Sequence, residues 1–222
     1  METGLGKTCL KRIIRIAPPI CDKCGRPQRL NAVKETWCSQ CRDSNYYFSV
    51  ARSVALYDGA LREYLAELKY RYRPDLGEAL GLLLVDWARL QTAFFKKIDL
   101  ILSVPIHPQK MEVRGYNQAE LLAKPLGRYL GIRVGQDILT RWKQTESQNA
   151  LNKAARYANI DGAFQVVDAS VLPGSRILLV DDIITTGATV SEAARVLLRA
   201  GAIEIKVLTL ATGAIDWEWV NE

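Results

Sequence analysis

Apolar positions along the chain change their period in a way that predicts strands and helices in alternation. Three short apolar runs predict buried strands, and a segment rich in Val, Phe and Tyr predicts a further strand or pair of strands. These segments span residues 46–57, 100–104, 177–180 and 203–211. Amphipathic repeats predict helices at residues 60–70, 76–95, 118–130 and 189–200. Strands that alternate with helices of about ten residues or more indicate an α/β fold, with a mainly parallel sheet flanked by helices.

The first 45 residues lack this pattern and are rich in Cys, Lys, Arg and Pro. We therefore expect two domains, an N-terminal module at residues 1–45 and an α/β domain at residues 46–222. The module contains two Cys-x2-Cys pairs, Cys21 with Cys24 and Cys38 with Cys41. Two such pairs are typical of a four-thiolate zinc ribbon, and Zn²⁺ would stabilise a segment with few core residues. Redox-active pairs or disulfides are the alternatives, and a cytoplasmic location disfavours stable disulfides.

Composition narrows the function classes only slightly. The formal net charge of +6 and the isoelectric point near 9.1 favour polyanionic partners, such as phosphorylated metabolites or nucleic acid, without selecting between them. No apolar run reaches the roughly eighteen residues that a membrane-spanning helix needs, so no membrane span is expected. Because no small-residue cleavage site follows the basic N-terminus, we expect a cytoplasmic protein.

Residues 177–189 form the strongest functional motif in the chain. Asp181 and Asp182 follow an apolar run, and ligands of parallel sheets collect at the carboxyl ends of the strands. Gly187 permits a tight turn whose N–H groups converge on an anion, and the next helix adds the partial positive charge of its N-terminus. Neighbouring carboxylates accept hydrogen bonds from vicinal sugar hydroxyls. The motif thus predicts a site for a ribose phosphate, against the alternative of a capped turn with two solvated acids.

The run VDDIITTGAT at residues 180–189 closely resembles the signature of type I phosphoribosyltransferases. The resemblance implies a mobile hood over the sheet and the substrate 5-phosphoribosyl 1-pyrophosphate, bound with Mg²⁺. It also implies that Asp181 and Asp182 bind the ribose hydroxyls and act in catalysis. The 5′-phosphate would be bound by Thr185, Thr186, Gly187, Ala188 and Thr189. Thr185 stands where the 6-oxopurine salvage members have an Asp that serves as a base, so turnover of hypoxanthine or guanine is not expected.

Five strings spread over nearly the whole chain resemble the ComF family of competence-associated phosphoribosyltransferase-like proteins. They are YDG at 57–59, LKYR at 68–71, VPIHP at 104–108, RGYNQAELLA at 114–123, and a fifth, spaced string that consists of Gln148, Leu151, Asn152, Arg156, Asn159, Ile160 and GAF at 162–164. In phosphoribosyltransferases the loop after the early strand binds the pyrophosphate, and the resemblance implies this role for Arg114. His107, the only histidine, either approaches the phosphates or is an ordinary loop residue.

Residues 141–156 are polar and precede the last pair of predicted strands. They form either a mobile lid over the site or a solvated helix and loop. With a lid, we expect Arg156 to reach the ligand and to act in catalysis. Lys69 and Arg141 are further expected ligand contacts.

Two kinds of function remain open. An enzyme would transfer the ribosyl group through an oxocarbenium-like state while Mg²⁺ and Arg stabilise the leaving pyrophosphate, although no residue is identified that activates the acceptor. The alternative is a non-catalytic nucleotide-sensing or single-stranded DNA-binding competence factor, because the resemblance implies a link to imported DNA and the competence machinery. Trp37, Tyr46 and Tyr47 would then stack on bases, unless they are structural residues of the zinc module.

Overall fold

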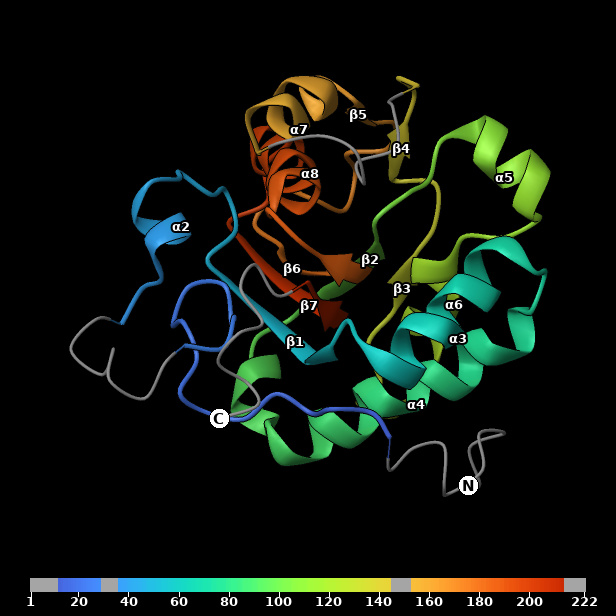
Figure 1. Ribbon diagram of the computed structural model, residues 1–222. Coiled ribbons are helices and arrows are strands. Elements are labelled where there is room, and N and C mark those ends of the chain that lie inside the picture. Colours follow the sequence, from blue (N-terminus) through green and yellow to red (C-terminus); the bar gives the residue numbers. More distant parts are fainter. Residues whose placement is uncertain (1–11, 29–35, 145–152, 214–222) are drawn as a thin grey trace.

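A five-stranded parallel sheet forms the centre of the protein (Figure 1). The computed structural model describes residues 12–28, 36–144 and 153–213. The strand order is β1-β7-β6-β2-β3, so the first and last strands of the chain lie side by side. In this order the strands are β1 (Val50–Leu56), β7 (Glu204–Thr212), β6 (Arg176–Ile184), β2 (Leu100–Ser103) and β3 (Val134–Gly135). The inner strands are buried over most of their length, as a sheet covered on both faces requires.

Three helices lie on one face of the sheet and one lies on the other (Figure 1). They are α3 (Gly59–Tyr70), α4 (Pro74–Leu90) and α6 (Gln118–Leu130) on the first face and α8 (Ala188–Arg199) on the second. Successive residues of β6 point to opposite faces, as the pleat of a strand dictates. Leu178 and Val180 therefore belong to the core under the three helices, whereas Ile177 and Leu179 belong to the core under α8.

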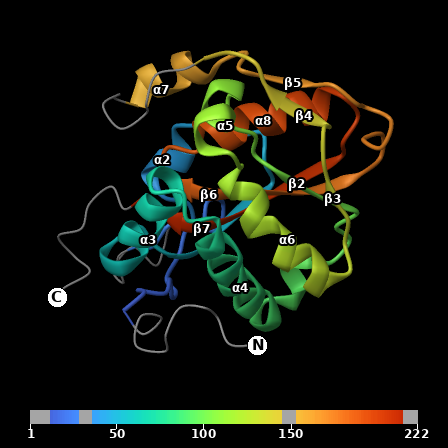
Figure 2. The same cartoon turned by 90° about the vertical axis from the view of Figure 1, so that its right-hand side faces the viewer.

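The remaining elements are short. They are α2 (Ser39–Arg42), the 3-10 helix η2 (Thr92–Phe95), α5 (Pro108–Arg114), β4 (Leu139–Arg141), α7 (Lys153–Ile160) and β5 (Phe164–Val166). β4 and β5 form a separate antiparallel pair. Figure 2 shows α5, α7 and this pair together on the side of the sheet that carries α8. They form a layer over that side of the sheet.

The N-terminal segment packs against the outer edge of the sheet. The Ile16 N–H donates to Val54 O at 3.1 Å, and the Leu56 N–H donates to Ile14 O at 2.9 Å. Ile13 is buried in the same core as α3 and α4. This antiparallel segment covers the otherwise open edge of β1 and protects it from pairing with another chain.

The structure confirms the predicted α/β class but moves several element boundaries. The segment 46–57 contains one strand that starts at Val50, where pairing with β7 begins. The helix predicted at 76–95 ends at Leu90 and is followed by η2. β6 continues to Ile184 because β7 pairs with it as far as Thr212, so the two aspartates lie within the strand rather than after it. No helix among the described residues is long and apolar enough to cross a membrane.

Candidate functional site

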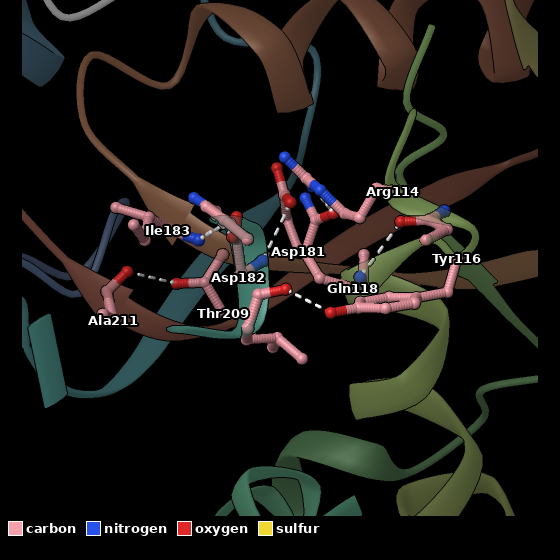
Figure 3. Close-up of polar contacts among 12 residues, drawn as sticks. Arg114, Tyr116, Gln118, Asp181, Asp182, Ile183, Thr209 and Ala211 are labelled. Carbon is pink, nitrogen blue, oxygen red and sulfur yellow. Dashed lines mark hydrogen bonds and ion pairs between the residues drawn. The ribbon is translucent and has the colours of Figure 1, made fainter. Parts of the chain in front are cut away.

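Strand β6 carries Asp181 and Asp182 past the end of its neighbour β2. The pairing of β2 with β6 ends at Ser103, opposite Val180, while β6 itself runs on to residue 184. Each carboxylate is oriented by the following backbone N–H. The Asp182 N–H donates to Asp181 Oδ1 and the Ile183 N–H donates to Asp182 Oδ1, both at 2.8 Å (Figure 3). Both acids are thereby held at the carboxyl end of the sheet.

The two acids are buried close to each other. Asp181 is 8 % exposed and Asp182 is 4 % exposed. Lys69 of α3 places its Nζ 2.5 Å from Asp182 Oδ2, and within the described residues this ammonium is the only partner of that oxygen. Burial raises the pKa of Asp181, and the Asp182 carboxylate raises it further. Burial by itself lowers the pKa of Lys69, but the Asp182 charge outweighs this effect and the pKa is raised. The pair of acids therefore holds more negative charge than Lys69 alone neutralises.

A tight turn joins β6 to α8 and contains the residues predicted to bind a phosphate. Gly187 has a left-handed backbone with φ +79° and is the N-cap of α8. A Cβ atom at this position would lie 2.9 Å from the Tyr46 ring, so both the backbone angle and the space require glycine. The N–H groups of Thr186 and Gly187 donate to no acceptor within the described part of the chain. Two adjacent unpaired N–H groups at the start of a helix form a binding site for an anion.

Arg26 and Gln40 of the N-terminal module, together with Tyr46 directly after it, bind the carbonyl groups of this turn from behind. Gln40 Nε2 donates to Thr186 O at 2.6 Å, and the Tyr46 hydroxyl donates to the same oxygen at 2.7 Å. Arg26 Nη2 donates to Thr185 O, and its Nη1 donates to Gln40 Oε1. Burial raises the pKa of Tyr46, so its hydroxyl remains a donor at neutral pH. The back of the turn is thus a continuous hydrogen-bond network with the module.

Four cations gather near the two acids. Lys110 and Arg114 lie one helical turn apart on α5, Arg141 lies on β4, and Lys69 lies on α3. Partial burial of the ammonium lowers the pKa of Lys110, and Arg141, Arg114 and Lys69 lower it further. Burial likewise lowers the pKa of Arg141, while Asp181 raises it. Because charges shift one another's pKa mainly over short distances, Lys110 lies near the other three cations and Arg141 lies near Asp181.

Tyr116 and Gln118, at the start of α6, connect the helices that carry these cations. The Tyr116 hydroxyl donates to Leu68 O at 2.6 Å, directly before Lys69 in the chain. Arg114 Nη1 donates to Gln118 Oε1. Figure 3 shows the Arg114, Tyr116 and Gln118 side chains on one side of the two aspartates. These contacts fix the cations of α3 and α5 relative to each other.

The four cysteines of the N-terminal module converge on one point. All four Sγ atoms lie within 4.8 Å of one another, and those of Cys24 and Cys38 are 3.7 Å apart. A tetrahedral ion with metal–sulfur bonds of about 2.3 Å separates its sulfurs by about 3.8 Å, so the cluster fits a metal such as zinc. Contact with the Cys24 thiol lowers the pKa of Cys21, whereas contact with Cys21 raises the pKa of Cys41. A divalent cation would relieve this competition for protons.

Most of the predicted site residues lie around the end of β6. They are Asp181, Asp182, Lys69, Arg114 and the turn Thr185, Thr186, Gly187, Ala188 and Thr189. Arg156 lies on α7, where the hydroxyl of the next residue, Tyr157, donates to Thr186 O at 3.3 Å. The Arg156 side chain and residues 145–152 of the expected lid lie outside the described part of the structure. His107 caps α5, and its Nδ1 accepts the Gln109 N–H at 3.3 Å.

The sequence reasoning missed Lys110, Arg26 and Gln40. Lys110 precedes Arg114 by one helical turn, and Pro108 could have marked the start of that helix. For Gln40 no local signal exists, since its contact with Thr186 spans 146 residues of sequence.

Comparisons with known proteins agree with one another. The family model for the phosphoribosyl transferase domain matches residues 117–221, which include β6, the turn and α8. DNA utilization protein YhgH of Escherichia coli O6:H1 is 32 % identical over 210 residues, covering 93 % of this chain and 89 % of the relative. Competence protein F of Haemophilus influenzae is 31 % identical over 213 residues, covering 95 % and 91 %. Competence protein ComFC of Bacillus subtilis is 31 % identical over 211 residues, covering 91 % and 82 %.

Proposed function

Because the chain belongs to the ComF family of phosphoribosyltransferase-like competence proteins, we propose that it binds 5-phosphoribosyl 1-pyrophosphate with Mg²⁺ at the carboxyl end of β6. One observation carries this proposal. A single short segment presents the buried acids Asp181 and Asp182 at one end and, at the other, the N–H groups of Thr186 and Gly187, which have no acceptor in the described part of the chain. Carboxylates accept from sugar hydroxyls and N–H groups donate to phosphate oxygens, so a ribose 5-phosphate complements both ends.

The turn is assigned to the 5′-phosphate. Its backbone donors stand at the N-terminus of α8, whose aligned peptide dipoles favour an anion there. The residues in this role are Thr185, Thr186, Gly187, Ala188 and Thr189. The left-handed backbone and the Tyr46 ring behind the turn require a residue without a side chain at position 187.

The two acids are assigned to the ribose hydroxyls and to the neighbourhood of Mg²⁺. Burial and then the Asp182 carboxylate raise the pKa of Asp181, and hydroxyl donors or a cation of the ligand would stabilise its charged form. When bound with the ligand, Mg²⁺ neutralises charge on the pyrophosphate oxygens. In this assignment Lys69 pairs with Asp182 and faces the ligand from α3.

The pyrophosphate is assigned to the cations around Asp181. Arg114 and Lys110 lie on α5 and Arg141 lies on β4, and both arginines lie close enough to Lys110 to lower its pKa in addition to the effect of burial. Guanidinium groups bind phosphate oxygens in a bidentate way, and clustered cations stabilise the charge that a leaving pyrophosphate develops. Arg156 of α7 is assigned the same role, because Tyr157 holds α7 next to the turn.

If the ligand is turned over, the protein's main contribution is to hold both ends of the sugar, so that the anomeric carbon faces an acceptor. Asp181, Asp182 and Arg156 are the residues proposed to act in this step. A cleft of about 580 Å³ beside the loop 105–108 is large enough for a small acceptor. Its polar lining includes Ser103 and Asn117.

Calorimetric titration with 5-phosphoribosyl 1-pyrophosphate and Mg²⁺ tests the proposal. We expect the wild-type chain to bind, and the double variant Asp181→Asn with Asp182→Asn to lose binding because both hydroxyl acceptors lose their charge. Asp168→Asn is the matched control, since Asp168 is an exposed acid that accepts the Ser170 N–H. Absence of binding to folded wild-type protein at millimolar ligand would contradict the proposal.

We assign zinc to the four-cysteine cluster. Four thiolates in tetrahedral array are typical of a structural zinc site, and the absence of a fifth protein ligand among the described residues fits a closed rather than a catalytic centre. Metal analysis of the purified chain is expected to give one zinc per chain.

A second candidate function is binding of single-stranded DNA, with or without catalysis. Tyr70, Tyr72 and Trp142 are 74 %, 69 % and 60 % exposed, and two of them directly adjoin Lys69 and Arg141 in the chain. Exposed aromatic rings beside cations provide stacking surfaces and phosphate contacts for a single strand. The names of the relatives, which refer to competence and to DNA utilization, favour the same partner.

Fluorescence anisotropy with a labelled oligothymidylate tests this second function. We expect affinity to fall steeply with salt, because phosphate contacts release counterions, and to fall again in Tyr72→Ala and Trp142→Ala. Tyr129→Ala is the control, since this exposed ring lies over Arg89. A salt slope near zero would argue against a DNA-binding surface. Tyr46 is not a stacking candidate, because its hydroxyl is bonded to Thr186 O.

A further inference from the structure

We propose that Arg26 and Gln40 are positioning residues for the anion-binding turn, so that metal binding by the cysteine module and phosphate binding by the turn stabilise each other. The inference rests on the proposed function of the turn. It extends that function by assigning a role to the N-terminal module, which otherwise stands outside the phosphoribosyltransferase-like domain.

The planarity of the peptide bond provides the first step. In a trans peptide unit the C=O of one residue and the N–H of the next point in opposite directions. Gln40 and Tyr46 hold Thr186 O, and the N–H of the same peptide unit belongs to Gly187. Arg26 holds Thr185 O, and the N–H of that unit belongs to Thr186. The module therefore binds the carbonyl side of the same two peptide units whose N–H groups have no acceptor among residues 12–28, 36–144 and 153–213.

The same pattern continues one residue earlier. Ile184 O accepts the Gly213 N–H at 3.0 Å and the Thr212 hydroxyl at 3.3 Å, both from the end of β7. The sheet thus orients the peptide unit that precedes the turn, and the module orients the next two. Hydrogen bonds to a carbonyl also polarise its peptide unit, which makes the N–H on the other side a stronger donor to an anion.

Both positioning residues are fixed by the geometry of the metal-binding pairs. Gln40 lies inside the second pair, between Cys38 and Cys41, and the Cys41 N–H donates to Cys38 O at 3.0 Å. Arg26 follows the first pair, and the Cys21 N–H donates to Arg26 O at 2.7 Å. Arg26 also donates to Gln40, so the two pairs are connected at the turn as well as at the cysteines. An ion that draws the four thiolates together therefore fixes both donors at the turn.

Binding of ribose 5-phosphate to the variant Gln40→Ala tests the positioning role. This probe lacks the pyrophosphate and so reports mainly on the turn and the two acids. We expect Gln40→Ala to weaken ribose 5-phosphate binding about tenfold, which is the typical effect of losing one hydrogen bond. The zinc content should stay at one per chain. Gln28→Ala is the matched control, since Gln28 belongs to the same module, is partly exposed and donates to Thr36 O rather than to the turn. Wild-type affinity in Gln40→Ala would overturn the inference.

Zinc release from the wild-type chain provides a second test that needs no variant. Coupling between two binding sites is reciprocal. The factor by which bound zinc strengthens ribose 5-phosphate binding must therefore equal the factor by which bound ribose 5-phosphate strengthens zinc binding. We expect the apparent zinc affinity, measured by competition with a chromogenic chelator, to rise about tenfold at saturating ribose 5-phosphate. An unchanged zinc affinity would overturn the inference even if Gln40→Ala fails to fold. If the wild type does not bind ribose 5-phosphate at all, the proposed function itself fails and the coupling fails with it.

Discussion

Replacement of Lys69 by methionine should destabilise the protein far more than the loss of an ordinary surface charge. Lys69 Nζ lies 2.5 Å from Asp182 Oδ2, and the two side chains are 19 % and 6 % exposed. At this separation two unit charges attract by about 7 kcal/mol if the effective dielectric constant is about 20. Desolvation of the ammonium offsets part of this attraction, and removal of one partner of a buried pair costs about 3–5 kcal/mol. Because Lys69 retains some exposure, we expect about 3 kcal/mol.

Urea unfolding at pH 8, followed by tryptophan fluorescence, measures this loss. The control is Lys124→Met, which breaks an ion pair with Glu120 at 2.9 Å on the surface of α6. An exposed pair of this kind contributes about 1 kcal/mol or less. The additional change Asp182→Asn should restore part of the stability of Lys69→Met, because it removes the carboxylate that the first substitution left unpaired.

The pH dependence of the loss gives a sharper test. Because the pKa of Lys69 is raised in the folded protein, its contribution to the stability of the fold is fully present below the pKa that it has in the unfolded chain. Lys69 therefore stays charged from pH 5 to pH 8. The raised pKa of Asp181 means that this carboxyl takes up a proton as the pH falls, which relieves the repulsion in the variant. The destabilisation by Lys69→Met should therefore shrink from pH 8 to pH 5. A loss below 1 kcal/mol at pH 8, or one independent of pH, would refute this account.

Three further predictions concern the acids, the turn and the metal. Asp181→Asn should raise the free energy of unfolding at pH 8 by at least about 1 kcal/mol, because a carboxyl group with a raised pKa destabilises the folded state once the pH is high enough to ionise it. This gain in stability should disappear near pH 4, and urea unfolding at both pH values measures it. Gly187→Ala should lower stability by about 1–3 kcal/mol and weaken ribose 5-phosphate binding, because of the positive φ and the clash with Tyr46; wild-type values in both assays would contradict this. Cys24→Ser should abolish stoichiometric zinc in metal analysis and lower stability by several kcal/mol, and retention of one zinc per chain would argue against the four-thiolate site.

The sequence was sufficient to predict the fold class because buried parallel strands are short, nearly continuous apolar runs. Residues 177–180 are such a run, and the helix after it repeats its apolar positions with helical period. The end of β6 could not be predicted in this way. The sequence predicts that Asp181 and Asp182 follow the strand, but both lie within β6 because this part of the strand pairs with Thr209 and its neighbours on β7. That pairing is a tertiary interaction and leaves no local signal.

In the candidate site, too, some residues could be predicted from the sequence and others could not. Its acids and its turn were predicted because one contiguous segment supplies them, with Gly187 as a local marker of the turn. The residues behind the turn were not predicted, because Arg26 and Gln40 read as ordinary polar residues between cysteines. Only the folded chain brings them to Thr185 and Thr186.

The charges around β6 provide an independent argument for a ligand that binds both the acids and the cations of the site. Burial and repulsion by Asp182 raise the pKa of Asp181, while burial and then the neighbouring cations lower the pKa of Lys110. Opposite charges that only stabilised the fold would be expected to pair, as Lys69 and Asp182 do. Acids that lie beside acids, and cations that lie beside cations, are stabilised most by a ligand with two kinds of group. Such a ligand places hydroxyls or a metal ion at the acids and phosphates at the cations. A phosphorylated ribose bearing a pyrophosphate has both properties, whereas a simple phosphate or a free cation would relieve only one of the two clusters.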